Sequence, residues 1–367
     1  LYVGDSYAKG PGYINNEGVF YEFDLLFDAK SSESALGEGI FVRDITETET
    51  AEENITTVAE FNPVIEEGGV NIALKKWALL TDPDFTSYYD GFGKSVATNG
   101  IYTVVSAEQE DNILGYDTGV VYIFNATGDL LYTIDNPNPV TPTYDEFGRS
   151  VAIDGNYVII GGWFGWGAEE LTGKAYIYDL TTFPTTPSTI SSATYVLDNP
   201  NAYNTIIGDN FGQSVAISGN YAIVGAYQED DAGGTNSGKA YIYDLTTLPT
   251  APATITSATY VLDNPNAFGT SADDHFGWSV AISGNYAIVG AALEWSSDGE
   301  DDAGGLSSGK AYIYDLTSFP TVPSTITSAT YVLDNPNAYG TSADDRFGQS
   351  VAISGNYAIV GAYFEDD

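Results

Sequence analysis

Acidic residues crowd several glycine-rich stretches, such as "QEDDAGG" (228–234) and "EWSSDGEDDAGG" (294–305). Carboxylate and amide oxygens beside glycine carbonyls are the ligands that hard divalent cations prefer, so these stretches predict calcium or magnesium binding. Asp, Asn and Gly are also good turn residues whose side chains bond nearby amides, and this alternative stays open. The candidate ligands are Asp230, Asp231, Asp273, Asp274, Asp301, Asp302, Asp344 and Asp345.

Four of the five tryptophans lie in or beside the same stretches. Exposed indole rings stack on sugar rings or anchor protein interfaces, which makes these residues candidates for ligand binding. Trp278 follows a Phe-Gly pair at a position that holds Lys, Arg or Gln in the other copies of the motif, so we expect it to be exposed. Packing between loops or across blades is the alternative for all four, and it is favoured for Trp163 and Trp166. The candidates are Trp163, Trp166, Trp278 and Trp295.

The sequence contains few residues suited to catalysis, and we predict that the chain is not an enzyme. The single histidine, His275, lies where other copies carry Gly, Glu, Asn or Arg, which predicts a variable, solvent-facing side chain. A Ser–His–Asp triad is excluded because the recurring Ser214 and its counterparts have no histidine partner. A pair of acidic side chains could still support glycoside hydrolysis, so a glycan-processing enzyme remains an alternative.

The charge balance restricts the partners of the chain. Asp and Glu number 51 against 11 Lys and Arg, for a net charge of −40. Such a surface repels phosphate backbones and anionic lipids, which argues against nucleic-acid binding, and it suits cations or a basic partner. The sequence contains no cysteine and no run of 18 apolar residues. We therefore expect no disulfide bonds and no insertion into a membrane.

A repeated motif sets the architecture. The pattern Phe-Gly-x-Ser-Val-Ala begins at Phe92, Phe147, Phe211, Phe276 and Phe347. Segments 263–291 and 334–362 differ at only three positions. Internal repeats of this kind indicate one supersecondary unit used several times.

One repeat reads as four short strands. Residues 214–218 alternate branched and small side chains, as a strand does, and a Gly219-Asn220 turn leads to a returning strand at 221–226, as in a hairpin. A third strand is expected at 239–245 and a fourth at 259–265, after a proline-rich connection. In the first repeat a tight "NATGD" turn joins the corresponding strands, which indicates an antiparallel meander.

Four-stranded sheets with apolar residues on both faces predict an all-β fold, a β-propeller, with a solenoid as the alternative. We expect complete blades at 92–146, 147–210, 211–275 and 276–346. A partial blade at 1–91, which contains an insertion at 26–76, and another at 347–367 would flank them within one domain, 1–367. Together with the lack of Met, these incomplete blades predict a piece of a longer protein whose intact ring has six or seven blades.

The motif also resembles a known repeat. Phe211-Gly212, followed thirteen residues later by Gly225-Ala226, resembles the FG-GAP repeat of integrin α-subunit propellers, with Tyr227 where the family has Pro. No stretch fits the D-x-D-x-D-G calcium loop of that family, so the resemblance does not carry calcium over. The segment "DNPNAYGTSADDRFGQSVAISGNYAIVGAY" is similar in sequence to segments of repeat-rich virion, tail-fibre and surface proteins of marine cyanophages and bacteria.

The resemblance implies an extracellular, non-enzymatic role in structure or adhesion. We expect a virion or fibre component that mediates attachment or assembly, with a protein or glycan partner on a cell surface or within the virion. A bacterial cell-surface adhesin is the alternative. Function would then depend on what differs between copies, because the shared residues build the fold.

Overall fold

The computed structural model describes residues 80, 82–83, 90–111, 117–139, 145–162, 173–200, 208–230, 236–265, 274–292, 308–336 and 345–364. The chain divides into two units, Leu1–Ala73 and Leu74–Asp367, and every described residue lies in the second. Most of the partial blade expected at 1–91, including its insertion at 26–76, therefore lies outside the described residues. None of the described helices is long and apolar enough to cross a membrane.

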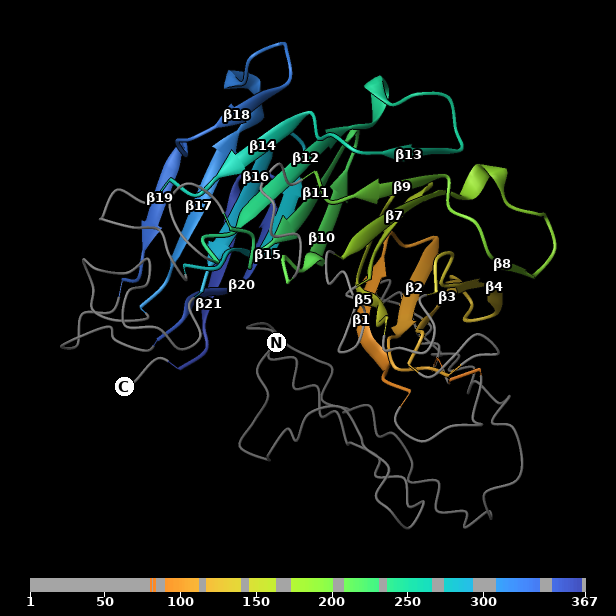
Figure 1. Ribbon diagram of the computed structural model, residues 1–367. Helices are drawn as coiled ribbons and strands as arrows, with labels where there is room; N and C mark the ends of the chain where they lie inside the picture. The colour runs from red at the N-terminus through yellow and green to blue at the C-terminus, as the bar shows by residue number, and fades with distance from the viewer. Residues whose placement is uncertain are drawn as a thin grey trace, which may run out of the picture. The chain divides into compact units, whose positions relative to one another are not determined.

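Each repeat forms an antiparallel sheet whose four main strands follow chain order (Figure 1). Sheet 1 contains β1 (Phe92–Thr98), β2 (Tyr102–Ala107), β3 (Val120–Asn125) and β4 (Leu130–Asp135). Sheet 2 contains β5 (Phe147–Asp154), β6 (Tyr157–Gly162), β7 (Lys174–Asp179) and β9 (Tyr195–Asp198). Sheet 3 contains β10 (Phe211–Ser218), β11 (Tyr221–Ala226), β12 (Lys239–Asp244) and β14 (Tyr260–Asp263). Sheet 4 contains β15 (Phe276–Ser283), β16 (Tyr286–Ala291), β17 (Lys310–Asp315) and β19 (Tyr331–Asp334), and β20 (Phe347–Ser354) pairs with β21 (Tyr357–Ala362).

These sheets confirm the all-β fold with repeated four-stranded units of the propeller type. The expected strands, the Gly-Asn turns and the tight 125–129 turn are found within a few residues of the positions given by the sequence. Four complete sheets and the β20–β21 hairpin form an open series rather than a closed ring among the described residues. The six or seven blades of an intact ring stay a prediction.

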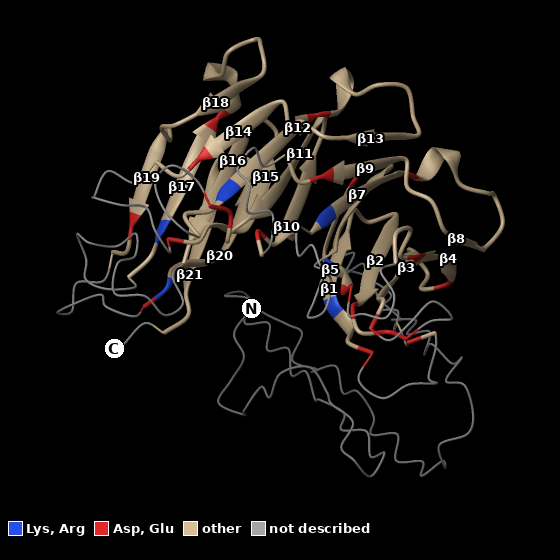
Figure 2. Ribbon diagram, in the orientation of Figure 1, with Lys and Arg blue, Asp and Glu red and all other residues tan. Residues whose placement is uncertain are grey.

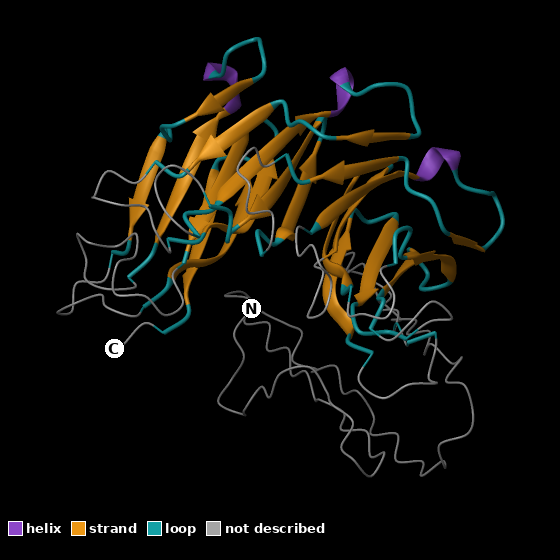
Figure 3. Cartoon of the chain, viewed as in Figure 1, coloured by secondary structure: helices purple, strands orange, loops and turns teal. Residues whose placement is uncertain are grey.

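The proline-rich connections contain a strand that the sequence reading missed. Each connection begins with one 3₁₀ turn, drawn purple in Figure 3, and these turns are η1 (Leu180–Thr182), η2 (Leu245–Thr247) and η3 (Leu316–Ser318). It continues into a three-residue strand, which is β8 (Ser188–Ile190), β13 (Ala253–Ile255) or β18 (Ser324–Ile326). Each of these strands pairs in parallel with the fourth strand of the preceding sheet, β4, β9 or β14. We call them clasp strands.

Side chains fix each clasp strand to the preceding sheet. The hydroxyl of Tyr260 in sheet 3 donates to the carbonyl oxygen of Pro320 at 2.9 Å, and its ring packs edge-on against Phe319 at 5.0 Å. Tyr132 makes the same hydrogen bond to Pro184 at 2.8 Å. Each connection therefore completes the sheet of the previous repeat.

The hydrophobic core lies between consecutive sheets. Ile223 and Ile242 of sheet 3 pack with Phe276, Val280 and Val289 of sheet 4, and all five are buried. The serine of the repeated motif links the same faces, since its hydroxyl accepts the N–H of a valine in the next sheet, as in Val280 to Ser214 at 3.0 Å. That N–H lies beside a β-bulge that interrupts the hairpin register. The recurring serine therefore has a structural role.

Charged residues lie mostly near the strand ends, while the strand bodies consist largely of uncharged residues (Figure 2). The lysine that opens a third strand pairs with the aspartate that closes the fourth. Lys239 lies 2.7 Å from Asp263, and Lys310 lies 3.4 Å from Asp334. These cross-strand pairs hold the register at one end of each sheet.

Candidate binding surface

The Phe-Gly pair forms a tight turn that is flanked by two variable positions. In sheet 4 the N–H of Trp278 donates to the carbonyl oxygen of His275 at 3.1 Å, and Gly277 has φ +94°. A positive φ at the third residue is the requirement of a type II turn, which explains the glycine. The residue before Phe and the residue after Gly differ between repeats, so they can vary on a constant backbone.

Glycines also allow the sheets to approach closely at this turn. A Cβ added to Gly277 would lie 2.2 Å from the carbonyl oxygen of Lys239 in sheet 3. A Cβ on Gly225 of sheet 3 would lie 2.0 Å from the carbonyl oxygen of Gly277. Gly161 has the same relation to Gly212, at 1.9 Å. The Phe-Gly and Gly-Ala glycines thus form the place where consecutive sheets touch.

Three aromatic side chains meet at the turn of sheet 4. The ring of Tyr227, which follows β11, lies 4.6 Å from Trp278 and 5.2 Å from His275, edge-on to both. The rings of His275 and Trp278 are nearly parallel at 6.1 Å. We call these three residues the aromatic cluster. Two neighbouring sheets contribute to it.

The aromatic cluster corrects the expectation for the single histidine. His275 is only 8% exposed, whereas the sequence reading placed it in solvent. The cause is its left-handed backbone, φ +55°, which lets the side chain pack with Tyr227 and Trp278. Trp278 is half-buried rather than fully exposed, so one part of its ring packs and another part faces solvent.

The equivalent position between sheets 1 and 2 is ionic. Glu108, which follows β2, lies 2.8 Å from Lys94 and 3.2 Å from Arg149. Arg149 also lies 3.5 Å from Glu146 and donates to Gln213 of sheet 3 at 3.4 Å. We call Lys94, Glu108, Glu146 and Arg149 the ionic cluster. The variable positions of adjacent repeats are therefore close enough to form one surface.

A family model described as "FG-GAP repeat" matches residues 141–178, 202–243, 267–314 and 337–367. Four segments of the chain are therefore similar to FG-GAP repeats. The glycines of the Phe-Gly and Gly-Ala pairs that carry this similarity are the contact points between sheets described above.

A solved structure offers a more distant comparison. The chain is similar to apo AztD from Citrobacter koseri, with 11% sequence identity, a TM-score of 0.34 and alignment over 73% of this chain. The alignment spans about half, 50%, of the length of that protein. A comparison with curated proteins finds no match.

The Phe-Gly turn of sheet 2 contains an acid whose pKa is raised. Burial raises the pKa of Glu146 from 4.5 to about 7, and the nearby negative charge of Glu108 raises it further, while Arg149 opposes the shift. Because the folded state holds this proton more tightly than the unfolded state, folding stability falls as pH rises from about 4.5 to 7.

We therefore expect Glu146→Gln to flatten the pH dependence of stability. Relative to the variant, the wild type should lose about 3 kcal/mol of unfolding free energy between pH 4.5 and pH 8, since one pKa unit corresponds to about 1.4 kcal/mol. Urea unfolding at a series of pH values measures this difference. Parallel profiles for the two proteins would contradict the assignment.

The predicted ligand residues are only partly within the described part of the chain. Trp163, Trp166 and Trp295 and the acids Asp231, Asp273, Asp301, Asp302 and Asp344 lie outside it. The N–H of Asn236 donates to Asp230 at 2.9 Å, and side-chain amides donate to Asp274 and Asp345 at 2.7 and 2.8 Å. No group of three or more His, Asp or Glu suited to a metal occurs in the described ranges. Calcium binding stays a prediction.

Asp274 and Asp345 belong to a contact that occurs four times among the described residues. Their amide partners, Asn264 and Asn335, lie in the recurring Asp-Asn-Pro stretch of the preceding sheet. Asn136 and Asn199 make the same bond to Asp145 and Asp209, at 2.9 and 2.7 Å. All four aspartates are buried, and their recurrence before Phe-Gly is the sequence signal for this structural role.

A buried acid–tyrosine pair was also missed. The hydroxyl of Tyr122 donates to both carboxylate oxygens of Glu110, at 2.6 and 2.7 Å, and Tyr241 does the same to Glu229. Burial raises the pKa of Tyr241 well above its usual value, and the Glu229 charge adds to the shift. The pair fixes the loop between the second and third strands to the sheet. The only sequence signal for this pair is the tripeptide Gln-Glu-Asp, which occurs at 109–111 and again at 228–230.

Proposed function

We propose that this chain is a non-enzymatic extracellular scaffold that mediates attachment or assembly as a virion or fibre component. The observation that carries the proposal is the division of each FG-GAP repeat into a constant frame and variable turn residues. The frame residues pack between sheets, while positions such as Arg149 and Gln213 meet across adjacent sheets and form a surface. Such a surface can change its partner without changing the fold.

The chemistry of that surface favours a protein or a neutral glycan as partner. The half-buried ring of Trp278 is held by Tyr227 and His275, and rigid aromatic side chains bind sugars and protein side chains at low entropic cost. A net charge of −40 disfavours anionic ligands, including nucleic acid. Calcium remains a proposed cation for the acidic loops.

Trp278→Gln tests the proposal with a residue that two sister repeats, at Gln213 and Gln349, already carry. We expect the wild type to bind members of a panel of immobilised neutral oligosaccharides or cell-surface proteins, and the variant to bind at least about tenfold more weakly. Its melting temperature should stay near that of the wild type. Equal binding by the two proteins would remove the aromatic cluster from the proposal.

Two alternatives have distinct signatures. Release of reducing sugar from the oligosaccharides, lost in single Asp→Asn variants of the acidic loops, would indicate a glycan-processing enzyme instead. Sequencing of the neighbouring genes distinguishes a virion component from a bacterial adhesin. Capsid, baseplate or tail genes would support the virion component, whereas a secretion signal with a surface anchor would support a bacterial adhesin.

A further inference from the structure

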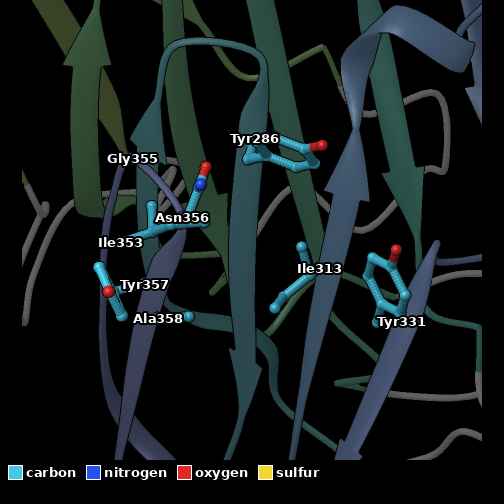
Figure 4. A pocket seen from close by; sticks show the side chains of 8 residues that line it. All are labelled: Tyr286, Ile313, Tyr331, Ile353, Gly355, Asn356, Tyr357 and Ala358. Carbon is cyan, nitrogen blue, oxygen red and sulfur yellow. The ribbon is translucent and has the colours of Figure 1, made fainter.

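The turn between β1 and β2 contains the only Asn-Gly pair in the sequence, Asn99-Gly100. Aspartate or serine precedes the turn glycine in the other four hairpins, at Asp154, Ser218, Ser283 and Ser354. The turn glycine is exposed in all five hairpins, so water reaches it in every repeat. Figure 4 shows the equivalent turn between β20 and β21, with Gly355 and Asn356 at its tip.

Gly100 gives the side chain of Asn99 a reactive neighbour. Glycine has no Cβ, so nothing on residue 100 blocks the approach of its amide nitrogen to the side-chain amide carbon of Asn99. A Cβ added to Gly100 would meet no atom within 4 Å, and its N–H donates to the hydroxyl oxygen of Thr98 at 3.2 Å. Gly100 lies outside the paired residues of β1 and β2, so loss of its amide proton breaks no hydrogen bond of that pair of strands.

The backbone of the turn holds the side-chain amide of Asn99 and activates it. The oxygen Oδ1 accepts the N–H groups of Ile101 and Tyr102, both at 3.0 Å. When the Gly100 nitrogen attacks the side-chain amide carbon, negative charge develops on this same Oδ1, and N–H donors already directed at it stabilise that charge. One turn therefore combines the nucleophile, a fixed amide carbon and the donors for the developing charge.

The side-chain nitrogen of Asn99 takes part in a contact between consecutive sheets. Nδ2 donates to the carbonyl oxygen of Gly155, in the corresponding turn of sheet 2, at 2.7 Å. The next link has the opposite polarity, since the carboxylate of Asp154 accepts the N–H of Gly219 in sheet 3 at 2.5 Å. A carboxylate in place of the Asn99 amide therefore has a precedent in the same chain.

We propose that Asn99 is a site of spontaneous modification, at which the folded turn converts asparagine to aspartate and isoaspartate. Hydroxide takes the Gly100 amide proton, the bond from this nitrogen to Cγ forms, and the Cγ–Nδ2 bond breaks. Nδ2 takes a proton from water and leaves as ammonia. Water then opens the five-membered imide at either carbonyl carbon, which restores one amide and leaves one carboxylate. Nothing is oxidised or reduced, and the inference does not depend on the proposed function.

Incubation of the full chain at mildly alkaline pH, followed by proteolysis and mass spectrometry, tests the proposal. We expect conversion at Asn99 at least about tenfold faster than at the turn asparagines that precede tyrosine, a difference of about 1.4 kcal/mol in barrier height. These matched controls within the same protein are exposed in equivalent hairpins, at Asn156, Asn220 and Asn285. Conversion at Asn99 no faster than at these residues would overturn the proposal.

Two further measurements separate the turn from the bare dipeptide. A synthetic peptide of residues 96–104, "VATNGIYTV", should convert more slowly than the folded chain, because it lacks the fixed N–H donors. Faster conversion in the peptide would show that the fold protects Asn99 and would contradict the proposal. The product should include isoaspartate, detected by an isoaspartyl methyltransferase, since direct hydrolysis of the side chain gives aspartate alone. Absence of isoaspartate would also contradict it.

Asn99→Ser is the control variant, because three sister turns already carry serine at this position. It should fold as the wild type does, as judged by circular dichroism, and should release no ammonia and form no isoaspartate in this turn. Asn99→Asp imitates one product and should also fold, with its carboxylate accepting the Gly155 N–H as Asp154 accepts that of Gly219. Isoaspartate that persists in Asn99→Ser at the wild-type level would place the reaction at another residue and overturn the assignment.

Discussion

Gly277→Ala should lower the free energy of unfolding by about 3 kcal/mol or more, from steric overlap added to backbone strain. The added Cβ lies 2.2 Å from the carbonyl oxygen of Lys239, a backbone atom that cannot move without shifting sheet 3. In addition, φ of +94° is a conformation that alanine rarely adopts. Both effects act at the contact between two sheets.

Gly93→Ala separates the two effects. Gly93 lies in the same type of turn with φ +87°, but no atom lies within 4 Å of its added Cβ. We expect this variant to lose only the backbone part, about 1–2 kcal/mol. Urea denaturation of both variants measures the difference. Equal losses would mean that the close approach of the sheets contributes nothing beyond the turn itself.

Replacing two tyrosines of β12 by phenylalanine should change stability in opposite directions. Tyr241→Phe removes the hydroxyl that donates to the fully buried Glu229, and a lost hydrogen bond to a buried charged group costs about 2–3 kcal/mol. Tyr243→Phe removes a buried hydroxyl that has no hydrogen-bond partner among the described residues, so stability should rise by about 1 kcal/mol.

The two substitutions make a matched pair, since both tyrosines are fully buried in one strand and each variant loses a single oxygen. Thermal and urea unfolding at neutral pH should move in opposite directions for the two variants. A stabilised Tyr241→Phe would show that Glu229 does not need this donor. A destabilised Tyr243→Phe would reveal an ordered water or another partner at its hydroxyl.

The regular parts of the fold could be predicted because each signal was local and repeated. Residues 214–218 alternate branched apolar and small side chains, and Gly219-Asn220 has the residues that a hairpin turn requires. Near-identical copies made the register of one repeat apply to the others.

Features that depend on neighbouring sheets could not be predicted. A three-residue strand such as β13 between prolines has too little pattern to be recognised, and it forms because the edge of β9 is available. His275 looked exposed because its position varies, but the turn places it against Tyr227 from another sheet. Variation between copies therefore identified a position that can change, but it did not show whether the side chain at that position is buried.

The clasp strands have a consequence for how the protein unfolds. The outer amides of β4, β9 and β14 are protected from solvent by residues that belong to the following repeat. Opening one repeat must therefore expose backbone in two sheets. Neighbouring repeats are thus coupled by backbone hydrogen bonds as well as by side-chain packing. Hydrogen exchange should occur in blocks that overlap by one strand, so that the cooperative unit of this chain is longer than its sequence repeat.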